Sequence, residues 1–196
     1  MKLELTSDQL VAIYRGSNIE SRKAIKEALG DKFSTELPIQ ERIKTFEDAM
    51  AELGDEHPAV RSYNSVKYGY AADKEPDIMA YLKLRIITTA LNEGWTPQFT
   101  KDERRWYAWY DLLDKEDLDG MTEEEKKERR VVGRASNNAH AFGGLVYSYA
   151  VYASTSSGAS YGSRLAFKSE ELAEYAGKQF IEIYADFCFI PEQSKA

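Results

Sequence analysis

The residues from Ile78 to Leu91 constrain the fold more than any other part of the sequence. Pro76 suits the first turn of a helix, and Gly94 suits the turn that ends one. Between them, apolar residues occupy much of the circumference of a helix: Ile78, Tyr81, Leu82, Leu84, Ile86, Ile87, Ala90 and Leu91. A helix that is apolar on most sides has to be surrounded by other elements. The sequence therefore predicts a central helix over about residues 76–93.

Three further helices are predicted before this one. The first follows Thr6 and ends at Gly16, and the second is expected over residues 19–29, before Gly30. The third follows Pro38, and its apolar residues recur at three- and four-residue steps: Ile39, Ile43, Phe46, Met50 and Leu53. Residues 55–74 lack this period and are predicted to form an ordered connection.

The pattern changes after residue 94. The aromatic run over residues 104–111 is typical of a half-buried strand, with a short helix as the alternative. The charged residues 111–130 favour a solvated helical excursion. Residues 143–153 and 160–167 are predicted to be two strands joined by a polar turn, and residues 169–190 a closing helix. The expected fold class is α+β in a single domain, 1–196. A helical body, made of residues 1–94 and the closing helix, carries a small antiparallel sheet within residues 95–168.

Composition excludes several classes of protein. The chain has 26 Lys and Arg against 33 Asp and Glu, and this acidic balance argues against a general nucleic-acid binder. Neither a signal peptide nor an apolar run of membrane-spanning length is found, so no membrane partner is expected. Cys188 is the only cysteine, which excludes an intramolecular disulfide and most zinc sites, and its apolar neighbours predict a buried, inert thiol.

Known catalytic patterns are missing from the sequence as well. The two histidines, His57 and His140, have no second imidazole or thiol at ligand spacing. The glycine-rich segments lack the Lys-Ser or Lys-Thr of a phosphate loop, and a calcium loop centred on Gly120 would place Lys115 and Lys126 at ligand positions. We therefore expect no catalytic residues, no metal and no cofactor, and a protein that is not an enzyme.

The most unusual feature is the absence of charge between Arg134 and Arg164. Asp, Glu, Lys and Arg make up 30% of the chain, yet residues 135–163 contain none of them and are rich in Tyr, Ser, Asn and Gly. Two interpretations stay open, a structural hairpin or a recognition surface, because Tyr supplies contact area at low entropic cost and Ser, Gly and Asn adapt their hydrogen bonds. The candidate ligand-binding residues are Asn137, Asn138, His140, Tyr147, Tyr149, Tyr152 and Tyr161.

Three segments carry a resemblance to a known family: IQERIKTFEDA at 39–49, ALNEGWTP at 90–97 and GSRLAFKSEELAEYAGKQF at 162–180. Together they resemble an uncharacterised family of phages and prophages of gut Bacteroides-type bacteria, over most of the chain from about residue 39. In such relatives the part before the Gly-Ser-Arg-Leu motif varies while its flanks keep their pattern. This is similar to the variable domains made by diversity-generating retroelements. For residues 95–168 the resemblance thus implies a C-type-lectin-like fold that displays variable side chains.

These observations predict a non-enzymatic, phage-encoded protein that presents its Tyr/Ser/Asn/Gly-rich stretch to a protein or glycan partner. The alternative is a cytoplasmic nucleic-acid-associated or host-takeover protein, and its candidate contacts are the basic residues at the borders of the stretch: Arg129, Arg130, Arg134 and Arg164. The expected location is the host cytoplasm or the phage virion. A homo-oligomer and a virion component are both left open.

Overall fold

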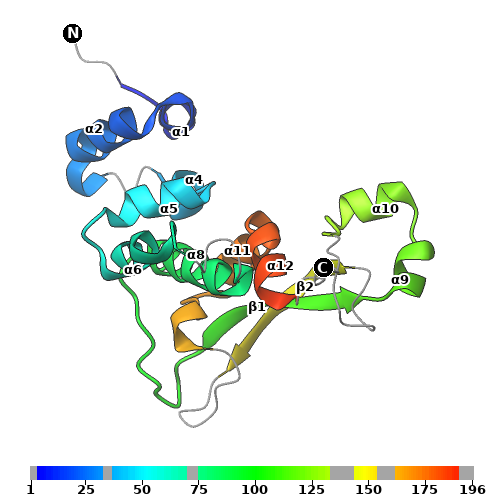
Figure 1. Ribbon diagram of the computed structural model, residues 1–196. Coiled ribbons are helices and arrows are strands. Elements are labelled where there is room, and N and C mark those ends of the chain that lie inside the picture. The colour runs from blue at the N-terminus through cyan, green and yellow to red at the C-terminus, as the bar shows by residue number, and fades with distance from the viewer. Residues whose placement is uncertain (1–3, 33–36, 70–74, 133–143, 154–161, 190–196) are drawn as a thin grey trace.

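The fold is α+β, as the sequence predicts (Figure 1). The computed structural model describes residues 4–32, 37–69, 75–132, 144–153 and 162–189. In the first half the helices are α1 (Ser7–Gly16), α2 (Ile19–Leu29), α4 (Ile39–Arg42), α5 (Phe46–Leu53), α6 (Pro58–Val66) and α8 (Pro76–Leu91), with a 3-10 turn η1 (Gly30–Lys32). In the second half β1 (Arg105–Leu113), α9 (Lys115–Asp119), α10 (Glu123–Glu128), β2 (Gly144–Ala153), the 3-10 turn η2 (Ser163–Leu165), α11 (Glu170–Gln179) and α12 (Ile181–Cys188) follow. None of the helices in the described ranges combines the length and the apolarity that a membrane span requires.

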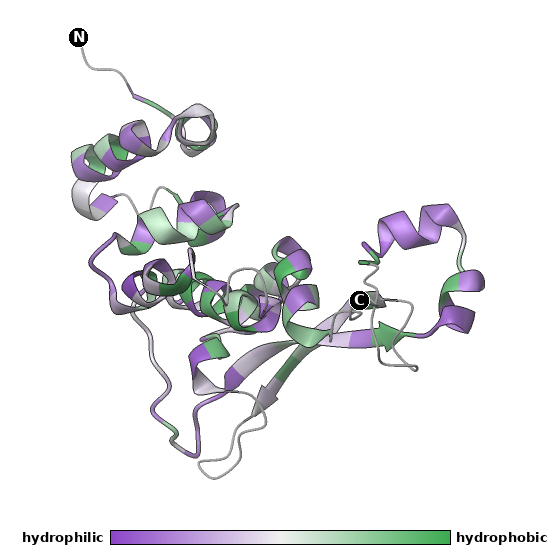
Figure 2. Cartoon of the chain, in the orientation of Figure 1, coloured by the Kyte–Doolittle hydropathy of each residue, from purple (hydrophilic) through white to green (hydrophobic). Residues whose placement is uncertain are grey.

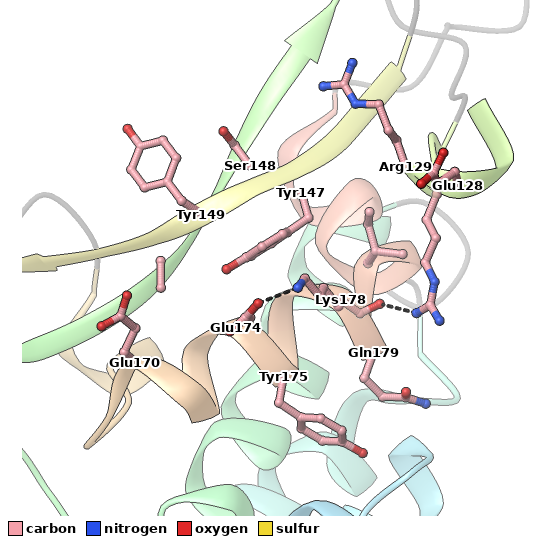
Figure 3. A pocket seen from close by; sticks show the side chains of 13 residues that line it. Glu128, Arg129, Tyr147, Ser148, Tyr149, Glu170, Glu174, Tyr175, Lys178 and Gln179 are labelled. Carbon is pink, nitrogen blue, oxygen red and sulfur yellow. Dashed lines mark hydrogen bonds and ion pairs between the residues drawn. The ribbon is translucent and has the colours of Figure 1, made fainter. Parts of the chain in front are cut away.

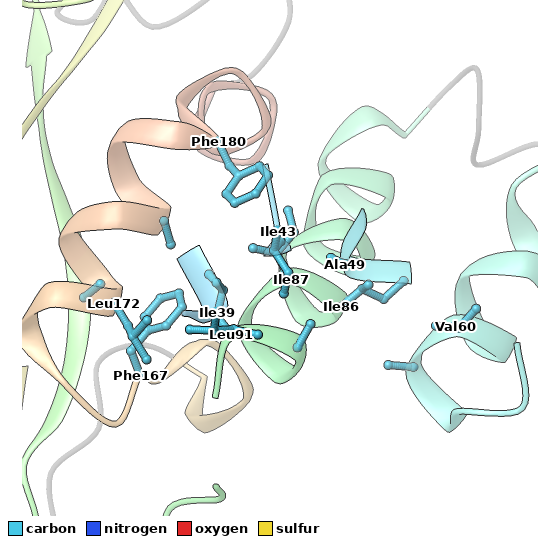
Figure 4. Close-up of a cluster of buried hydrophobic side chains, with 14 residues drawn as sticks. Ile39, Ile43, Ala49, Val60, Ile86, Ile87, Leu91, Phe167, Leu172 and Phe180 are labelled. Carbon is cyan, nitrogen blue, oxygen red and sulfur yellow. The ribbon is translucent and has the colours of Figure 1, made fainter. Parts of the chain in front are cut away.

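The central position predicted for α8 is confirmed. Leu84, Ile86, Ile87 and Leu91 are completely buried, and most of them belong to the main core (Figure 4). That core joins residues far apart in the sequence: Ile39, Ile43, Ala49, Ala59, Val60, Ile86, Ile87, Ala90, Leu91, Phe167, Leu172, Ala173, Ala176 and Phe180. The last five come from the segment that leads into α11 and from α11 to its end, so both halves of the chain build one core.

The helix predicted after Pro38 is two helices, α4 and α5, with a break at Ile43. Thr45 and Asp48 explain the break. The Thr45 hydroxyl accepts a hydrogen bond from the Asp48 backbone N–H, and the Asp48 carboxylate accepts the N–H groups of Lys44 and Thr45, which makes a capping box. A side chain of α11 binds a carbonyl that the break leaves without a helical partner: the Tyr175 hydroxyl donates to the Ile43 carbonyl at 2.6 Å. The apolar residues of 39–53 keep one helical period across the break, so this period alone predicts a single helix.

Three other expectations are corrected. The ordered connection predicted over residues 55–74 contains α6, which starts at Pro58 after His57 accepts the Ala59 N–H on its Nδ1 atom. The closing helix is divided at Phe180 into α11 and α12. The strand predicted over residues 160–167 is not formed where the structure describes it, since residues 163–165 form η2 and only Phe167 makes a bridge, to Trp106.

β2 pairs with β1 in an antiparallel sheet. The register runs from Arg105 opposite Ala153 to Leu113 opposite Gly144, with one irregularity where Ser148 is the extra residue of β2. Helix α11 lies against one face of the sheet (Figure 1). Between the two strands, α9 and α10 form a hydrophilic excursion without buried residues (Figure 2).

Residues of the segments 39–49, 90–97 and 162–180 hold the two halves of the molecule together. The Asn92 side chain donates to the Ala166 carbonyl at 2.8 Å and accepts the Lys168 N–H at 3.0 Å. The Glu93 carboxylate, next in sequence, pairs with the buried Arg42 guanidinium and with the Lys168 ammonium. Glu93 has a φ of 50°, a left-handed conformation that is uncommon outside glycine.

Candidate functional site

An open cleft of about 690 Å³ lies between β2, α11 and the residues that follow α10 (Figure 3). Residues 147–150 of β2 form one wall, and residues 128–130 form one end. The other wall belongs to α11 and the first residue of α12: Glu170, Glu174, Tyr175, Lys178, Gln179 and Ile181. Since the cleft contains residues from both predicted sets, the tyrosines and the arginines, it is the candidate site.

The bulge at Ser148 determines which side chains enter the cleft. Residues two apart on a regular strand point to the same face, but the extra residue sends Tyr147 towards α11 and leaves Tyr149 pointing away from it (Figure 3). The Tyr147 ring lies over α11 close to Gly177, with the Lys178 ammonium 5.3 Å from its centre. Tyr147 therefore forms the floor of the cleft, whereas Tyr149 stands on the opposite face of the sheet.

Charges of both signs surround the Tyr147 hydroxyl. Burial, together with the carboxylates of Glu174 and Glu170, raises the pKa of Tyr147 to about 12. Glu174 pairs with Lys178 one helical turn away, and the Lys178 carbonyl accepts a hydrogen bond of 3.3 Å from the Arg130 guanidinium. The Tyr147 hydroxyl thus stays protonated at neutral pH, as a hydrogen-bond donor rather than a base.

Two pairs of aromatic rings stand on opposite faces of the sheet. On the face away from α11, Trp109 stacks on Tyr149 with ring centres 6.2 Å apart and planes 21° apart. On the other face, towards the end of β2, Trp106 lies 5.0 Å from Tyr152, and the Arg104 guanidinium lies 5.0 Å from the Tyr152 ring. Tyr149 is 52% exposed and Tyr152 is 48% exposed. Trp109 contacts the Tyr149 ring, Trp106 and Arg104 contact the Tyr152 ring, and about half of each tyrosine stays exposed to solvent.

The structure brings together only part of the predicted sites. Tyr147, Arg129 and Arg130 line the cleft. Tyr149 borders the cleft but directs its ring to the opposite face of the sheet, and Tyr152 lies farther along the same strand. Arg164 is exposed on η2, at the far end of the sheet from α10 (Figure 1), so it does not converge with Arg129 and Arg130. Asn137, Asn138, His140, Tyr161 and Arg134 lie outside the described residues.

Sequence reasoning missed the α11 wall of the cleft and the tryptophan beside Tyr149. The signal for the wall was present, because Glu170, Glu174 and Lys178 recur every four residues and must share one helix face. The sequence favours a strand for the aromatic run that contains Trp109 and does not connect this residue with Tyr149. Its role depends on the register that places it opposite Tyr149, and a single sequence does not give that register.

The structure also shows the surroundings of the metal-ligating side chains and of the single thiol. Within the ranges that the structure describes, no three His, Cys, Asp or Glu side chains are close enough together to hold a metal ion. Cys188 is exposed rather than buried as expected, although the apolar residues around it raise the pKa of its thiol to about 11. Comparison of the chain with models of known protein families, with curated proteins and with solved structures finds no match.

Proposed function

We propose that the protein is a non-enzymatic, phage-encoded binding protein that presents the aromatic and small polar side chains of β2 to a protein or glycan partner. One observation carries the proposal: Tyr149 and Tyr152 project half-exposed rings from β2, one from each face of the sheet. Large aromatic rings are usually buried, because the transfer of their apolar surface out of water is favourable. Their exposure on a rigid strand is typical of a recognition surface.

The surroundings of the two tyrosines suit binding. Trp109 stacks on Tyr149, so the ring loses little conformational freedom when a partner covers it. In the cleft, Ser148 and Gln179 offer neutral hydrogen-bonding groups, and Glu170 and Arg129 offer charged ones. Trp, Tyr and Arg are the residues enriched in the energetic centres of interfaces. In the cleft, the Tyr147 ring with these polar groups around it also fits the apolar face and the hydroxyls of a sugar.

The phage origin rests on the resemblance carried by residues 39–49, 90–97 and 162–180. If residues 135–163 are diversified by a retroelement, the coding DNA has a reverse-transcriptase gene and a near-identical template repeat beside it. Sequencing of the gene neighbourhood checks this independently of any ligand.

The binding test compares the unchanged protein with the double variant Tyr149→Ala/Tyr152→Ala. Because both rings are half exposed, we expect the variant to keep its free energy of unfolding within about 1 kcal/mol. Binding to a glycan array and to purified envelope proteins of the bacterial host should fall at least tenfold. Tyr68→Ala is the matched control, since Tyr68 is 89% exposed and lies beyond α6, away from the sheet.

Two results would contradict the proposal. One is undiminished binding by the double variant to every ligand that the unchanged protein binds. The other is retention on single- or double-stranded oligonucleotides that weakens steeply with salt and is lost in Arg129→Ala/Arg130→Ala, because such retention is the mark of phosphate contacts.

A further inference from the structure

A second hollow, of about 330 Å³, lies on the other side of β1, away from β2. One of its walls consists of residues 107–110 and Leu112 of β1. The opposite wall consists of Leu165 of η2 and of Tyr184, Phe187 and Cys188 of α12. No lining residue carries a formal charge, and apolar surface predominates. We call this hollow the edge groove.

The lining shows that the groove runs along the edge of the strand. Successive side chains of a strand point to opposite faces, so a hollow on one face touches every second residue. The edge groove touches four consecutive residues, 107 to 110. Contact with consecutive residues is expected of a hollow at the edge of β1, where the backbone itself is accessible.

The direction of the backbone groups follows from the one bridge that this edge already makes. Trp106 exchanges two hydrogen bonds with Phe167, N–H to carbonyl at 3.0 Å and carbonyl to N–H at 2.8 Å. In an antiparallel ladder every second residue bonds to the same side, so Ala108, Tyr110 and Leu112 turn their N–H and C=O groups to this edge too. Among the residues that the structure describes, none forms a backbone hydrogen bond with these three on this side.

The chain itself begins a third strand here and then leaves it. Phe167 pairs with Trp106 in the antiparallel sense, and a continued strand would place the residues before Phe167 beside Ala108 and Tyr110. Instead η2 turns away at Ser163–Leu165, and the side chain of Leu165 packs against Ala108 and Tyr184. Beyond that point the edge of β1 keeps the geometry of a sheet, but no strand of the described residues pairs with it.

We propose that the open edge of β1 binds an extended, uncharged and apolar peptide segment of a partner protein as a third, antiparallel strand. Backbone hydrogen bonds to Ala108, Tyr110 and Leu112 hold the segment, as in other cases of strand addition. The uncharged lining selects apolar side chains, and Leu112, which is 45% exposed, gains a neighbour. Three outward-facing residues at intervals of about 6.8 Å correspond to a segment of about five residues. This site uses the outer edge of β1 rather than the rings of β2, and the two share only Trp109 among the residues that the structure describes.

The experiment uses the full chain labelled with ¹⁵N and a set of capped pentapeptides in which Thr alternates with Val, Ile, Leu or Phe. At millimolar concentration we expect at least one of these peptides to slow amide hydrogen exchange of Ala108, Tyr110 and Leu112 several-fold. The same peptide should slow alkylation of Cys188, the single cysteine, by iodoacetamide, as read from the intact mass.

Controls separate strand addition from other occupants. The same peptide with Pro at its centre lacks the N–H that pairs with β1 and should protect neither the amides nor Cys188. Leu112→Lys should weaken the protection at least fivefold, because charge on a sheet edge opposes pairing. Ile13→Lys, a change of an equally exposed residue on α1, should leave it unchanged. We expect circular dichroism to show both variants folded, because both residues are exposed.

Three results would overturn the proposal. They are the absence of protection with the whole peptide set, equal protection by the proline peptide, and self-association of the free protein that already protects Ala108, Tyr110 and Leu112. The first would show that the edge accepts no strand. The second would show that the groove takes apolar groups without strand pairing, and the third that a second copy of the chain is the occupant. None of these results depends on Tyr149 or Tyr152.

Discussion

Gly177 lies where α11 passes closest to the sheet, and the absence of a side chain there allows the contact. A Cβ atom at this position would stand 2.7 Å from the Tyr147 ring and 2.8 Å from the Ala108 Cβ. The Tyr110 hydroxyl donates to the Gly177 carbonyl at 2.9 Å, so the helix is tied to both strands at the same residue. The floor of the cleft thus depends on one glycine.

Gly177→Ala tests this contact. In a free helix the change is favourable by up to about 1 kcal/mol, but the overlap with Tyr147 and Ala108 should reverse the sign. We expect the free energy of unfolding to fall by about 1 to 3 kcal/mol in urea titrations. Gly16→Ala at the end of α1, where a Cβ would meet nothing within 4 Å, should be neutral or stabilising. Equal effects at the two positions would show that the close approach has no energetic weight.

Cys188 makes stability depend on alkaline pH. Its thiol has a pKa of about 11 in the folded chain against an ordinary value of 9.0, because the apolar surroundings disfavour the thiolate. Below pH 9 the thiol is protonated in both the folded and the unfolded chain, and its contribution to the free energy of unfolding is fully present. Between pH 9 and 11 only the unfolded chain loses the proton, so the folded chain loses stability as the pH rises.

The comparison with Cys188→Ala isolates this effect. We expect the difference in unfolding free energy between the unchanged chain and the variant to be constant from pH 7 to 8.5. From pH 8.5 to pH 11 the unfolding free energy of the unchanged chain should fall relative to that of the variant. Urea titrations at half-unit steps measure it, and a difference that stays constant over the whole range would show that the thiol does not feel its apolar neighbours.

At the scale of elements, the helix break between α4 and α5 shows why some predictions succeed and others fail. The ends of α1, α2 and α8 were predictable, because Thr6, Gly30 and Pro76 act through their own local conformation. The break was not, since Ile39, Ile43 and Phe46 all face the core and keep one apolar period across it. The Thr45–Asp48 capping box starts α5 locally, and hydrogen bonds from Tyr175 and Gln179, which lie over 130 residues away, bind the carbonyls of the interruption.

The same scale explains the candidate site. Composition identified β2 as unusual, and Tyr149 and Tyr152 are exposed on it. Composition could not reveal that β2 pairs with β1 instead of residues 160–167, because pairing depends on contacts between distant segments. The sequence alone therefore does not place Trp109, Glu174 and Lys178 beside β2.

Thr45→Ala tests the capping box that starts α5. The loss of a side-chain cap should lower the free energy of unfolding by about 1 kcal/mol, because the Asp48 N–H loses its partner beside the core residue Ala49. Thr122→Ala removes the same kind of cap from α10, which buries no residue, and should change global unfolding by less than about 0.5 kcal/mol. Chemical denaturation measures both, and a larger loss at Thr122 would contradict the assignment of α5 to the core.

At the scale of the whole molecule, ion pairs as well as the apolar core connect helices that are distant in the sequence. Arg42 is 3% exposed and pairs with Glu52 of α5 and with Glu93 after α8, and Glu52 also accepts Lys26 of α2. Arg22 of α2 pairs with Asp48. α2 is thus attached to α5 mainly by ion pairs, while α1 and α2 share a small apolar cluster of their own with Leu37.

The shared core has a consequence for synthesis on the ribosome. Ile86, Ile87 and Leu91 are made long before Leu172, Ala176 and Phe180, which cover them in the folded chain. At about 5 to 20 residues per second, the central helix waits on the order of ten seconds for its last neighbours. During that time its apolar surface is open to chaperones and to other nascent chains, so the yield of folded protein depends on how quickly translation reaches α11.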